Sequence, residues 1–318
     1  GLAKMSKTMA QLVHRAASMH GDSPALFMPS ASSAKLAMWT YAALSNKSRS
    51  LAAAFAARGI QRGSVVVSDV PNTQHNVLMQ VALSHIGATV ATVKDTHGLD
   101  KLKADGAKVF GILTPASPAL ATWSGWCALP VQVEEDSGAG WEELLQTSPT
   151  SLDAAPACTH AVFQGAALAS EEVVELAHLS ARALQLEAKD KVVVSVTLMH
   201  SFGLAMGLAA AFSQGASVVL PGVSGIRGCG SPQDRSQQTK EMIQASAATL
   251  LLADTHTIKE LRKLVHLDDA WAPTLRGGLC KIASGSTVLD PTHVPAEARE
   301  LMHLGNNVFL QAVGKKNP

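Results

Sequence analysis

The sequence is poor in aromatic side chains, in charged side chains and in cysteine. Aromatic residues make up 4% of the 318 residues and charged residues 16%, and the net charge at pH 7 is +1. This near-neutral balance gives no electrostatic footprint for a nucleic-acid partner. A hydrophobic content of 47% is too high for a disordered chain. Four isolated cysteines without CxxC spacing are expected to be buried thiols rather than disulfides or metal ligands, namely Cys127, Cys158, Cys229 and Cys280.

Uninterrupted hydrophobic runs are also missing. The longest apolar region, 191–220, is broken by polar residues at 200–201 and 213–214, so we predict no transmembrane segment. The glycine-rich stretch 222–230 lacks the order of a dinucleotide-binding motif and is interpreted as a loop. The sequence also lacks a Gly-x-Ser-x-Gly elbow and the spacing of histidine metal ligands, so neither a hydrolase nor a metal site is predicted.

What is present is an alternation of short apolar runs and helical patterns. This order is typical of an α/β fold with two doubly wound, mostly parallel sheets covered by helices. We predict a first domain, 1–150, with helices at 41–58, 73–85 and 99–105 and strands at 64–68, 88–93, 108–113 and 129–133. A passage at 134–156 that is rich in Ser, Thr and Pro marks the boundary. A second domain, 151–318, is predicted to hold strands at 159–163, 192–197, 217–220, 248–252, 279–283 and 308–311.

Several short segments follow one another in a characteristic order. They are TYAAL at 40–44, LAAAFAARGIQRGSVVV at 51–67, VPN at 70–72, HIGATV at 85–90, TLMHSFG at 197–203 and GASVVLP at 215–221. In this order they resemble the N-terminal part of the acyl-CoA synthetases and other adenylate-forming, AMP-binding enzymes. The resemblance runs from about residue 9 to the last residue at low identity. It implies αβαβα-like layering, and we expect the chain to lack the family's β-barrel and C-terminal domain.

The segment 163–178, FQGAALASEEVVELAH, stands where this resemblance implies a phosphate-binding loop. The family motif, YTSGTTGxPKG, surrounds the ATP phosphates with hydroxyl groups, glycine amides and a lysine, which are the donors that a phosphate needs. In an ungapped alignment, Gln164, Gly165 and Ala166 occupy hydroxyl and glycine positions, and Glu172 replaces the lysine. A carboxylate about 4 Å from a phosphate charge is repelled by about 4 kcal/mol at an effective dielectric of about 20. We therefore predict that ATP does not bind and that the chain has no cofactor.

The acidic residues of this segment have a structural interpretation as well. Ser170 followed by Glu171 and Glu172 is a favourable way to begin a helix, because a serine caps the amide groups and acids suit the helix dipole. The segment therefore predicts a helix start in place of a phosphate site.

A second nucleotide motif is degenerate near the end of the sequence. The segment LRGGLCKIASGS at 275–286 resembles the family's "LRxxxSGG" segment, and 310–317 stands at its "YGxTE" motif. In the family, that tyrosine packs on adenine, the threonine meets phosphate and the glutamate helps to hold magnesium. Only Gly314 matches here, whereas Val313, Lys316 and Asn317 replace these three residues. The resemblance thus predicts neither catalysis nor magnesium binding.

Three hypotheses for function follow. The first is a non-catalytic, structural or accessory subunit of a larger assembly, with protein subunits as partners and with the helical segment 202–212 and the segment after Val288 as docking surfaces. The second is an acyl or acyl-CoA binding module that uses a residual acyl pocket at His200, Phe202 and Gly203, although a lone histidine at a strand end is more often structural. The third is half of a split ligase. The start of the chain is basic and has no acid before Asp22, so a mitochondrial location is one hypothesis and a cytoplasmic location the alternative.

Overall fold

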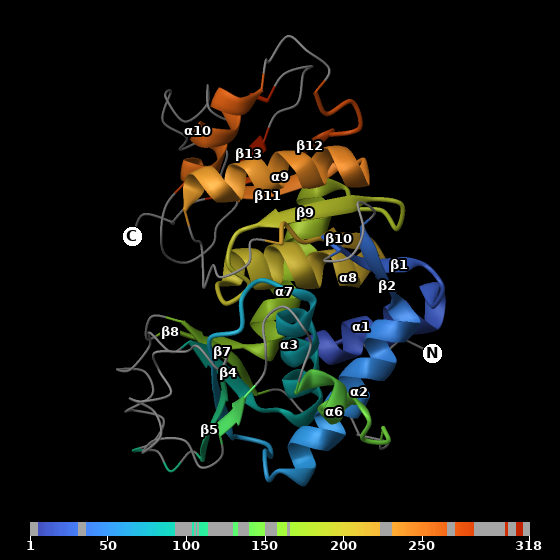
Figure 1. The fold of residues 1–318 in the computed structure, drawn as a ribbon, viewed down its shortest axis with the longest axis vertical. Helices are drawn as coiled ribbons and strands as arrows, with labels where there is room; N and C mark the ends of the chain where they lie inside the picture. Colours follow the sequence, from blue (N-terminus) through green and yellow to red (C-terminus); the bar gives the residue numbers. More distant parts are fainter. Residues whose placement is uncertain are drawn as a thin grey trace. The chain divides into compact units, whose positions relative to one another are not determined.

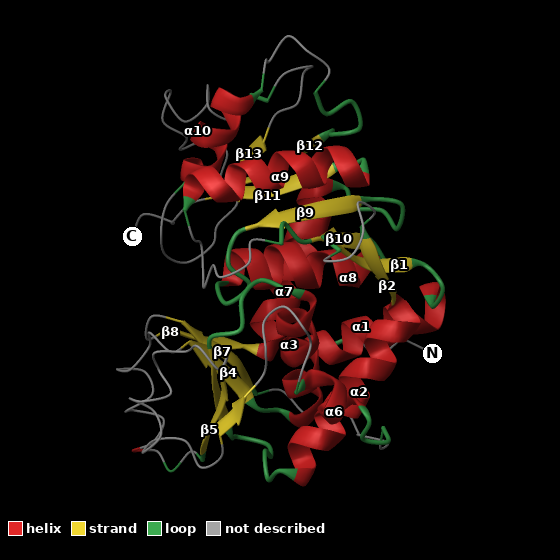
Figure 2. Cartoon of the chain, viewed as in Figure 1, coloured by secondary structure: helices red, strands yellow, loops and turns green. Residues whose placement is uncertain are grey.

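The computed structural model describes residues 6–30, 36–92, 104, 106, 108–113, 130–132, 140–149, 158–163, 166–222, 231–265, 271–282, 303–304 and 310–313. The chain divides into two compact units (Figures 1 and 2). Unit 1 comprises Gly1–Ser23 and Thr40–Leu176, and unit 2 comprises Pro24–Trp39 and Ala177–Pro318. Each unit is built around a sheet of its own.

Unit 1 contains a six-stranded sheet in the order β6-β5-β3-β4-β7-β8. Its parallel strands are β3 (Val65–Ser68), β4 (Thr89–Thr92), β5 (Val109–Leu113), β6 (Pro130–Gln132) and β7 (Thr159–Phe163). The last strand, β8 (Ala166–Ala169), runs antiparallel to β7. Strands such as β3 are continuous valine runs because helices bury both faces of a parallel sheet.

The helices of unit 1 are α1 (Met9–His20), α2 (Tyr41–Ala57), α3 (Gln74–Ile86) and α6 (Trp141–Leu145). Threonine side chains begin the first two: Thr8 Oγ1 accepts a hydrogen bond from the Gln11 amide at 3.3 Å, and Thr40 Oγ1 accepts one from the Ala43 amide at 3.2 Å. Gly87 ends α3 in the left-handed region at a φ of 80°. All residues from His75 to His85 are buried, so α3 is a core helix of this unit.

Unit 2 contains a seven-stranded sheet in the order β13-β12-β11-β9-β10-β1-β2. These strands are β1 (Pro24–Met28), β2 (Ala37–Thr40), β9 (Lys191–Ser195), β10 (Ser217–Val219), β11 (Leu250–Asp254), β12 (Gly277–Lys281) and β13 (Leu310–Val313). Its helical elements are α8 (Ala210–Gln214), α9 (Pro232–Ser246), α10 (Thr255–Leu264) and the π-helix η1 (Phe202–Ala209). The boundary between the units falls within α7 (Ser170–Leu184).

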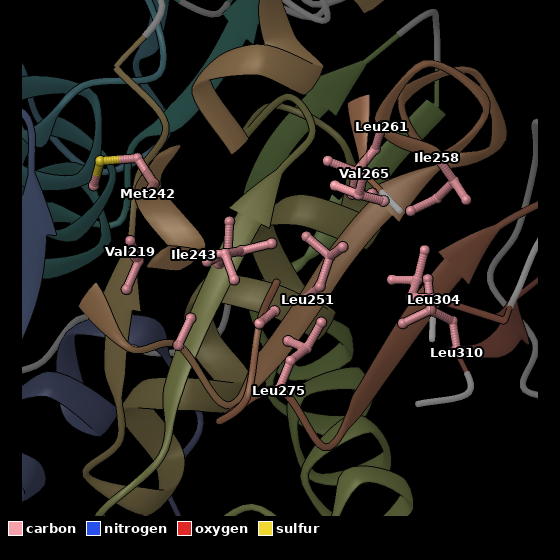
Figure 3. Close-up of a cluster of buried hydrophobic side chains, with 14 of the residues drawn as sticks. Val219, Met242, Ile243, Leu251, Ile258, Leu261, Val265, Leu275, Leu304 and Leu310 are labelled. Carbon is pink, nitrogen blue, oxygen red and sulfur yellow. The ribbon is translucent and has the colours of Figure 1, made fainter. Parts of the chain in front are cut away.

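The core of unit 2 lies between its central strands and the helices α9 and α10 (Figure 3). Val193 of β9 and Leu251 of β11 are fully buried against Ile243 and Ile258 from the two helices. Gly278 of β12 lies opposite Leu251, and a Cβ added there would come within 1.9 Å of the Leu251 carbonyl oxygen. Close approach of β12 to β11 therefore requires glycine at this position.

The predicted fold class is confirmed, because two largely parallel sheets flanked by helices are present. The division of the chain differs from the predicted one at 150/151. The strand at 159–163 was predicted in the second domain, but it pairs with β4 of unit 1. Conversely, β1 pairs with β10 of unit 2 although it lies near the start of the chain. The predicted helix at 99–105 lies, apart from residue 104, outside the described residues.

Candidate nucleotide and acyl sites

The segment at the predicted phosphate loop contains a strand. β8 pairs with β7 through the registers Phe163 with Ala166 and Val162 with Ala167, so only residues 164 and 165 connect the two strands. Gln164 and Gly165 themselves lie outside the described residues, and Ala166 is the first residue of β8. Six residues in all, 164–169, separate β7 from α7, and four of them belong to β8. The backbone N–H and C=O groups of β8 that face β7 form the hydrogen bonds of the sheet.

Helix α7 begins directly after β8, at Ser170, as the sequence predicts. The expected capping role of Ser170 takes a different form, because both its amide and its hydroxyl donate to the Cys158 carbonyl, at 2.8 and 3.0 Å. The hydroxyl also lies 3.4 Å from Cys158 Sγ, and Ser170 is buried. The Ser170 hydroxyl therefore donates its hydrogen bond to the residue that precedes β7 and not to a ligand.

The two glutamates occupy the first turn of α7. Glu171 pairs with Lys7 Nζ at 3.0 Å, and Glu172 is exposed. Because both partners of the ion pair are about half exposed, the pair contributes only a fraction of a kcal/mol. The carboxylates lie where the positive end of the helix dipole would otherwise favour a phosphate group.

The second degenerate motif is described only in part. Val313 is the last residue of β13, an edge strand of the seven-stranded sheet. Lys316 and Asn317 lie outside the described residues, as does the proposed docking segment after Val288 except for 303–304 and 310–313.

The residues predicted for an acyl pocket follow the carboxyl end of β9. The Phe202 amide nitrogen lies 3.0 Å from His200 Nδ1, and Lys281 Nζ at the end of β12 lies 3.0 Å from His200 Nε2. Burial, with a further contribution from the Lys281 charge, lowers the pKa of His200 from 6.5 to about 4, so the ring is neutral at pH 7. Lys281 was not identified from the sequence, since only the pairing of β9 and β12 on either side of β11 brings it to His200.

Phe202 and Gly203 begin the π-helix η1, an element that is rare and often found at functional sites. Phe202 is buried, and a Cβ on Gly203 would lie 2.2 Å from the Thr197 carbonyl oxygen. Close packing against Thr197 is therefore enough to explain why residue 203 is a glycine, and no ligand is needed for this explanation. The expectation that the helical segment 202–212 forms a docking surface is wrong, because every residue in it is buried.

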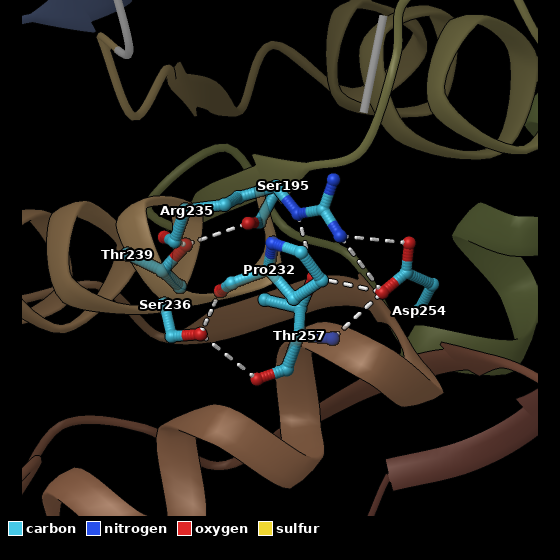
Figure 4. Close-up of polar contacts among 7 residues, drawn as sticks. All are labelled: Ser195, Pro232, Arg235, Ser236, Thr239, Asp254 and Thr257. Atoms are coloured by element: carbon cyan, nitrogen blue, oxygen red, sulfur yellow. Dashed lines mark hydrogen bonds and ion pairs between the residues drawn. The ribbon is translucent and has the colours of Figure 1, made fainter. Parts of the chain in front are cut away.

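A buried polar cluster that the sequence did not indicate lies at the carboxyl ends of β9 and β11 (Figure 4). Arg235 Nη2 from α9 lies 3.1 and 3.2 Å from the two carboxylate oxygens of Asp254, and Arg235 Nε donates to Thr257 Oγ1 at 2.6 Å. Asp254 also accepts from the Thr257 amide at 2.8 Å and so begins α10. Ser195 Oγ lies 2.6 Å from Thr239 Oγ1. These contacts clamp α9 to α10, which explains the cluster structurally.

Among the described residues, no group of three or more His, Cys, Asp or Glu side chains could hold a metal ion. None of the helices formed by these residues combines the length and the apolar character needed to cross a bilayer.

Comparison with known proteins confirms the resemblance seen in the sequence. Residues 13–104 match the family model described as "AMP-binding enzyme". No curated protein sequence matches the chain significantly. Among solved structures, VinN superposes with a TM-score of 0.70 at 17% identity, covering 95% of this chain and 73% of VinN. The N-terminal domain of FACL13 from Mycobacterium tuberculosis gives a TM-score of 0.73 at 14% identity, covering 99% of this chain and 76% of that chain.

A third similar structure is the O-succinylbenzoate coenzyme A synthetase MenE from Bacillus subtilis. It gives a TM-score of 0.68 at 16% identity and covers 93% of this chain but only 57% of the enzyme. At these identities the likeness shows the fold alone. The chain therefore has the fold of the N-terminal domains of adenylate-forming enzymes.

Proposed function

We propose that this chain is a non-catalytic relative of the adenylate-forming enzymes that serves as a structural, accessory subunit of a larger protein assembly. One observation carries the proposal: strand β8 fills the phosphate-loop segment and leads directly into a helix whose first turn holds Glu171 and Glu172. Other protein subunits are the proposed partners. A mitochondrial location is part of the proposal, and the basic, acid-free composition of residues 1–21 motivates it.

Binding a triphosphate requires several hydrogen-bond donors and a positive charge. A phosphate loop offers free backbone amides, hydroxyl groups and a cation. Here the stretch 166–169 consists of three alanines and a leucine in a paired strand, and the hydroxyl of Ser170 donates to Cys158. Two exposed carboxylates follow, and each repels a phosphate charge about 4 Å away by about 1 kcal/mol in water. The loss of the donors and the reversal of the charge both lower the affinity of this segment for a triphosphate.

A second candidate function is favoured by the contact between His200 and Lys281. The Lys281 ammonium group lies beside a neutral imidazole at the carboxyl ends of parallel strands, which is where α/β folds commonly bind ligands. A carboxylate or an acyl-CoA phosphate would suit such a cation. VinN, which shares this fold, has been solved in complex with L-aspartate, an acid ligand. The chain would then be an acyl or acyl-CoA binding module without ligase activity.

Isothermal titration separates the two candidates. Magnesium ATP and a long-chain acyl-CoA are titrated separately into the chain, and absence of heat in both titrations supports the structural role. Heat with acyl-CoA alone supports the binding module if Lys281→Met removes it. The matched control is Lys263→Met, because Lys263 is an exposed lysine that pairs only locally with Glu260. Native mass spectrometry of the protein isolated from its source tests the assembly, and a lone chain would contradict the accessory role.

A further inference from the structure

Three histidines of unit 1 are buried along the core helix α3. His75 lies in the first turn of α3 and His85 near its end, with 9% and 8% of their surfaces exposed. His160 of β7 is also buried, and its Nε2 lies 3.1 Å from Oε1 of Gln80, in the middle of α3. Histidine is the side chain that ordinarily changes its charge between pH 5 and 8. One helix therefore holds three groups that bind protons in mild acid when they are exposed to solvent.

Two of the rings have a nitrogen atom without a partner. The Nδ1 atom of His75 and the Nε2 atom of His85 are buried and make no hydrogen bond within the described part of the chain. A neutral imidazole has one nitrogen that carries no proton, whereas both nitrogens of the charged ring are donors. Protonation of either ring in the folded unit therefore leaves a charged, buried N–H without an acceptor, which is costly.

Helix α6 contacts the first turn of α3 through an aromatic pair. The ring of His75 stacks on Trp141, with the centroids 5.1 Å apart and the planes 5° from parallel. The two acids that follow Trp141, Glu142 and Glu143, are exposed and do not contribute to the pKa shift of His75. The buried Asp69, which follows β3, contributes to none of the three histidine shifts. No counter-charge thus favours a protonated ring here.

The charges that act on the two histidines of α3 are positive. α3 packs against α1, α2 and β4, and β4 contains no ionisable side chain. Burial, with a further contribution from Lys47 of α2, lowers the pKa of His75 to about 4. Burial also lowers the pKa of His85 to about 4, with further contributions from Arg49 and His14. The folded unit therefore holds both rings neutral in mild acid.

We propose that α3 is a proton-sensitive element that opens unit 1 in mild acid. The rings of His75, His85 and His160 take up protons when α3 separates from the core of unit 1, and these protons stabilise the open state. Unit 2 remains folded over the same pH range. This behaviour does not depend on the accessory role proposed above.

The size of the effect follows from the protons bound in each state. The three rings have pKa values of about 4 in the closed unit and 6.5 when exposed. The closed state is fully favoured above pH 6.5 and loses this advantage as the pH falls towards 4. Between pH 7.5 and pH 5 each ring raises the open population about thirtyfold, and three rings together raise it about 10⁴-fold. Folding equilibrium constants are commonly about 10³–10⁸, so this change is sufficient to open a unit of ordinary stability.

Hydrogen exchange on the full chain tests the proposal. Protection factors, corrected for the intrinsic pH dependence of exchange, are measured by mass spectrometry at pH 7.5 and pH 5. Those of α3 and β7 should fall at least about a thousandfold. Those of β11 should fall about thirtyfold at most, which is the change that the lowered pKa of His200 allows in unit 2. Equal losses of protection in the two units overturn the proposal.

Three substitutions identify the rings that bind the protons. His75→Phe keeps an aromatic ring for the stack with α6, and His160→Gln keeps a hydrogen-bond donor. These two variants and His85→Met should each reduce the pH-dependent fall in α3 protection about thirtyfold, and a change in basal stability cancels because each protein is compared with itself. His20→Gln is the matched control, because His20 lies at the end of α1 and is partly exposed, and it should keep the full fall. The same fall in all four variants contradicts the proposal.

Discussion

Acidification should destabilise unit 1 through His160. This residue lies on β7 with 1% of its surface exposed, and its Nε2 is 3.1 Å from Gln80 Oε1. The Gln80 amide nitrogen lies 3.5 Å from Asn76 Oδ1, and Asn76 donates to the Val70 carbonyl at 2.8 Å. His160 Nε2–H therefore donates a hydrogen bond to Gln80 Oε1, the first link in a chain of buried side-chain hydrogen bonds. Burial lowers the pKa of His160 from 6.5 to about 4, so the folded protein holds the ring neutral.

The sign and size of the effect follow from this lowered pKa. In the unfolded chain the ring binds a proton as the pH falls below 6.5, whereas in the folded chain it does so only near pH 4. The stabilisation is complete above pH 6.5 and is lost as the pH falls towards 4. The full difference corresponds to about 3 kcal/mol, and about 2 kcal/mol of it is lost at pH 5.

Urea unfolding measures this loss. The free energy of unfolding is determined at pH 8, 6.5 and 5, in buffers without phosphate, for the wild type and for His160→Gln. The wild type should lose about 2 kcal/mol more than the variant between pH 8 and pH 5. The buried His75 and His85 have pKa values lowered in the same way and remain in both proteins, so the difference isolates His160. Equal losses in the two proteins would refute the reasoning.

Three further predictions concern unit 2. Asp190→Asn should destabilise by about 2–3 kcal/mol in urea unfolding, because the carboxylate is almost completely buried 2.7 Å from Arg276 Nη2; an unchanged midpoint would contradict this. Gly203→Ala should cost about 3 kcal/mol, since its Cβ would meet the Thr197 backbone. Gly207→Ala should cost less, because its Cβ would meet side-chain atoms of Val194 at 3.0 Å and of Leu252 at 3.4 Å rather than backbone; the reverse order of urea midpoints would contradict this reading of the packing. Lys281→Met should raise the pKa of His200 in an NMR titration, because it removes a nearby positive charge; an unmoved titration curve would exclude their contact.

Much of the fold could be predicted from local sequence patterns. The valine runs at 65–67 and 192–194 are typical of buried parallel strands, and both are found there. β8 was not predicted because its sequence, AALA, has little strand propensity and is shaped by its pairing with β7. The membership of β1 in unit 2 depends on the pairing of Leu26 with Val218, which no local pattern encodes.

For the candidate sites too, local residue types could be predicted from the sequence, whereas contacts between distant residues could not. The absence of phosphate donors at 164–169 can be read from the residue types alone. The partners of these side chains cannot be predicted from residue types. Lys281 and His200 are 81 positions apart in the sequence, and Arg235 contacts Asp254 because α9 packs beside α10. A buried helix also looks like an exposed apolar one when its sequence is viewed alone, which is why the segment 202–212 was misassigned as a surface.

Equilibrium dialysis with magnesium ATP at about 1 mM tests the central claim most directly. We predict that the protein retains no ATP above the level of the solvent chamber, because a paired strand and two carboxylates stand in place of the phosphate donors between β7 and α7. Saturable retention of ATP would contradict this claim.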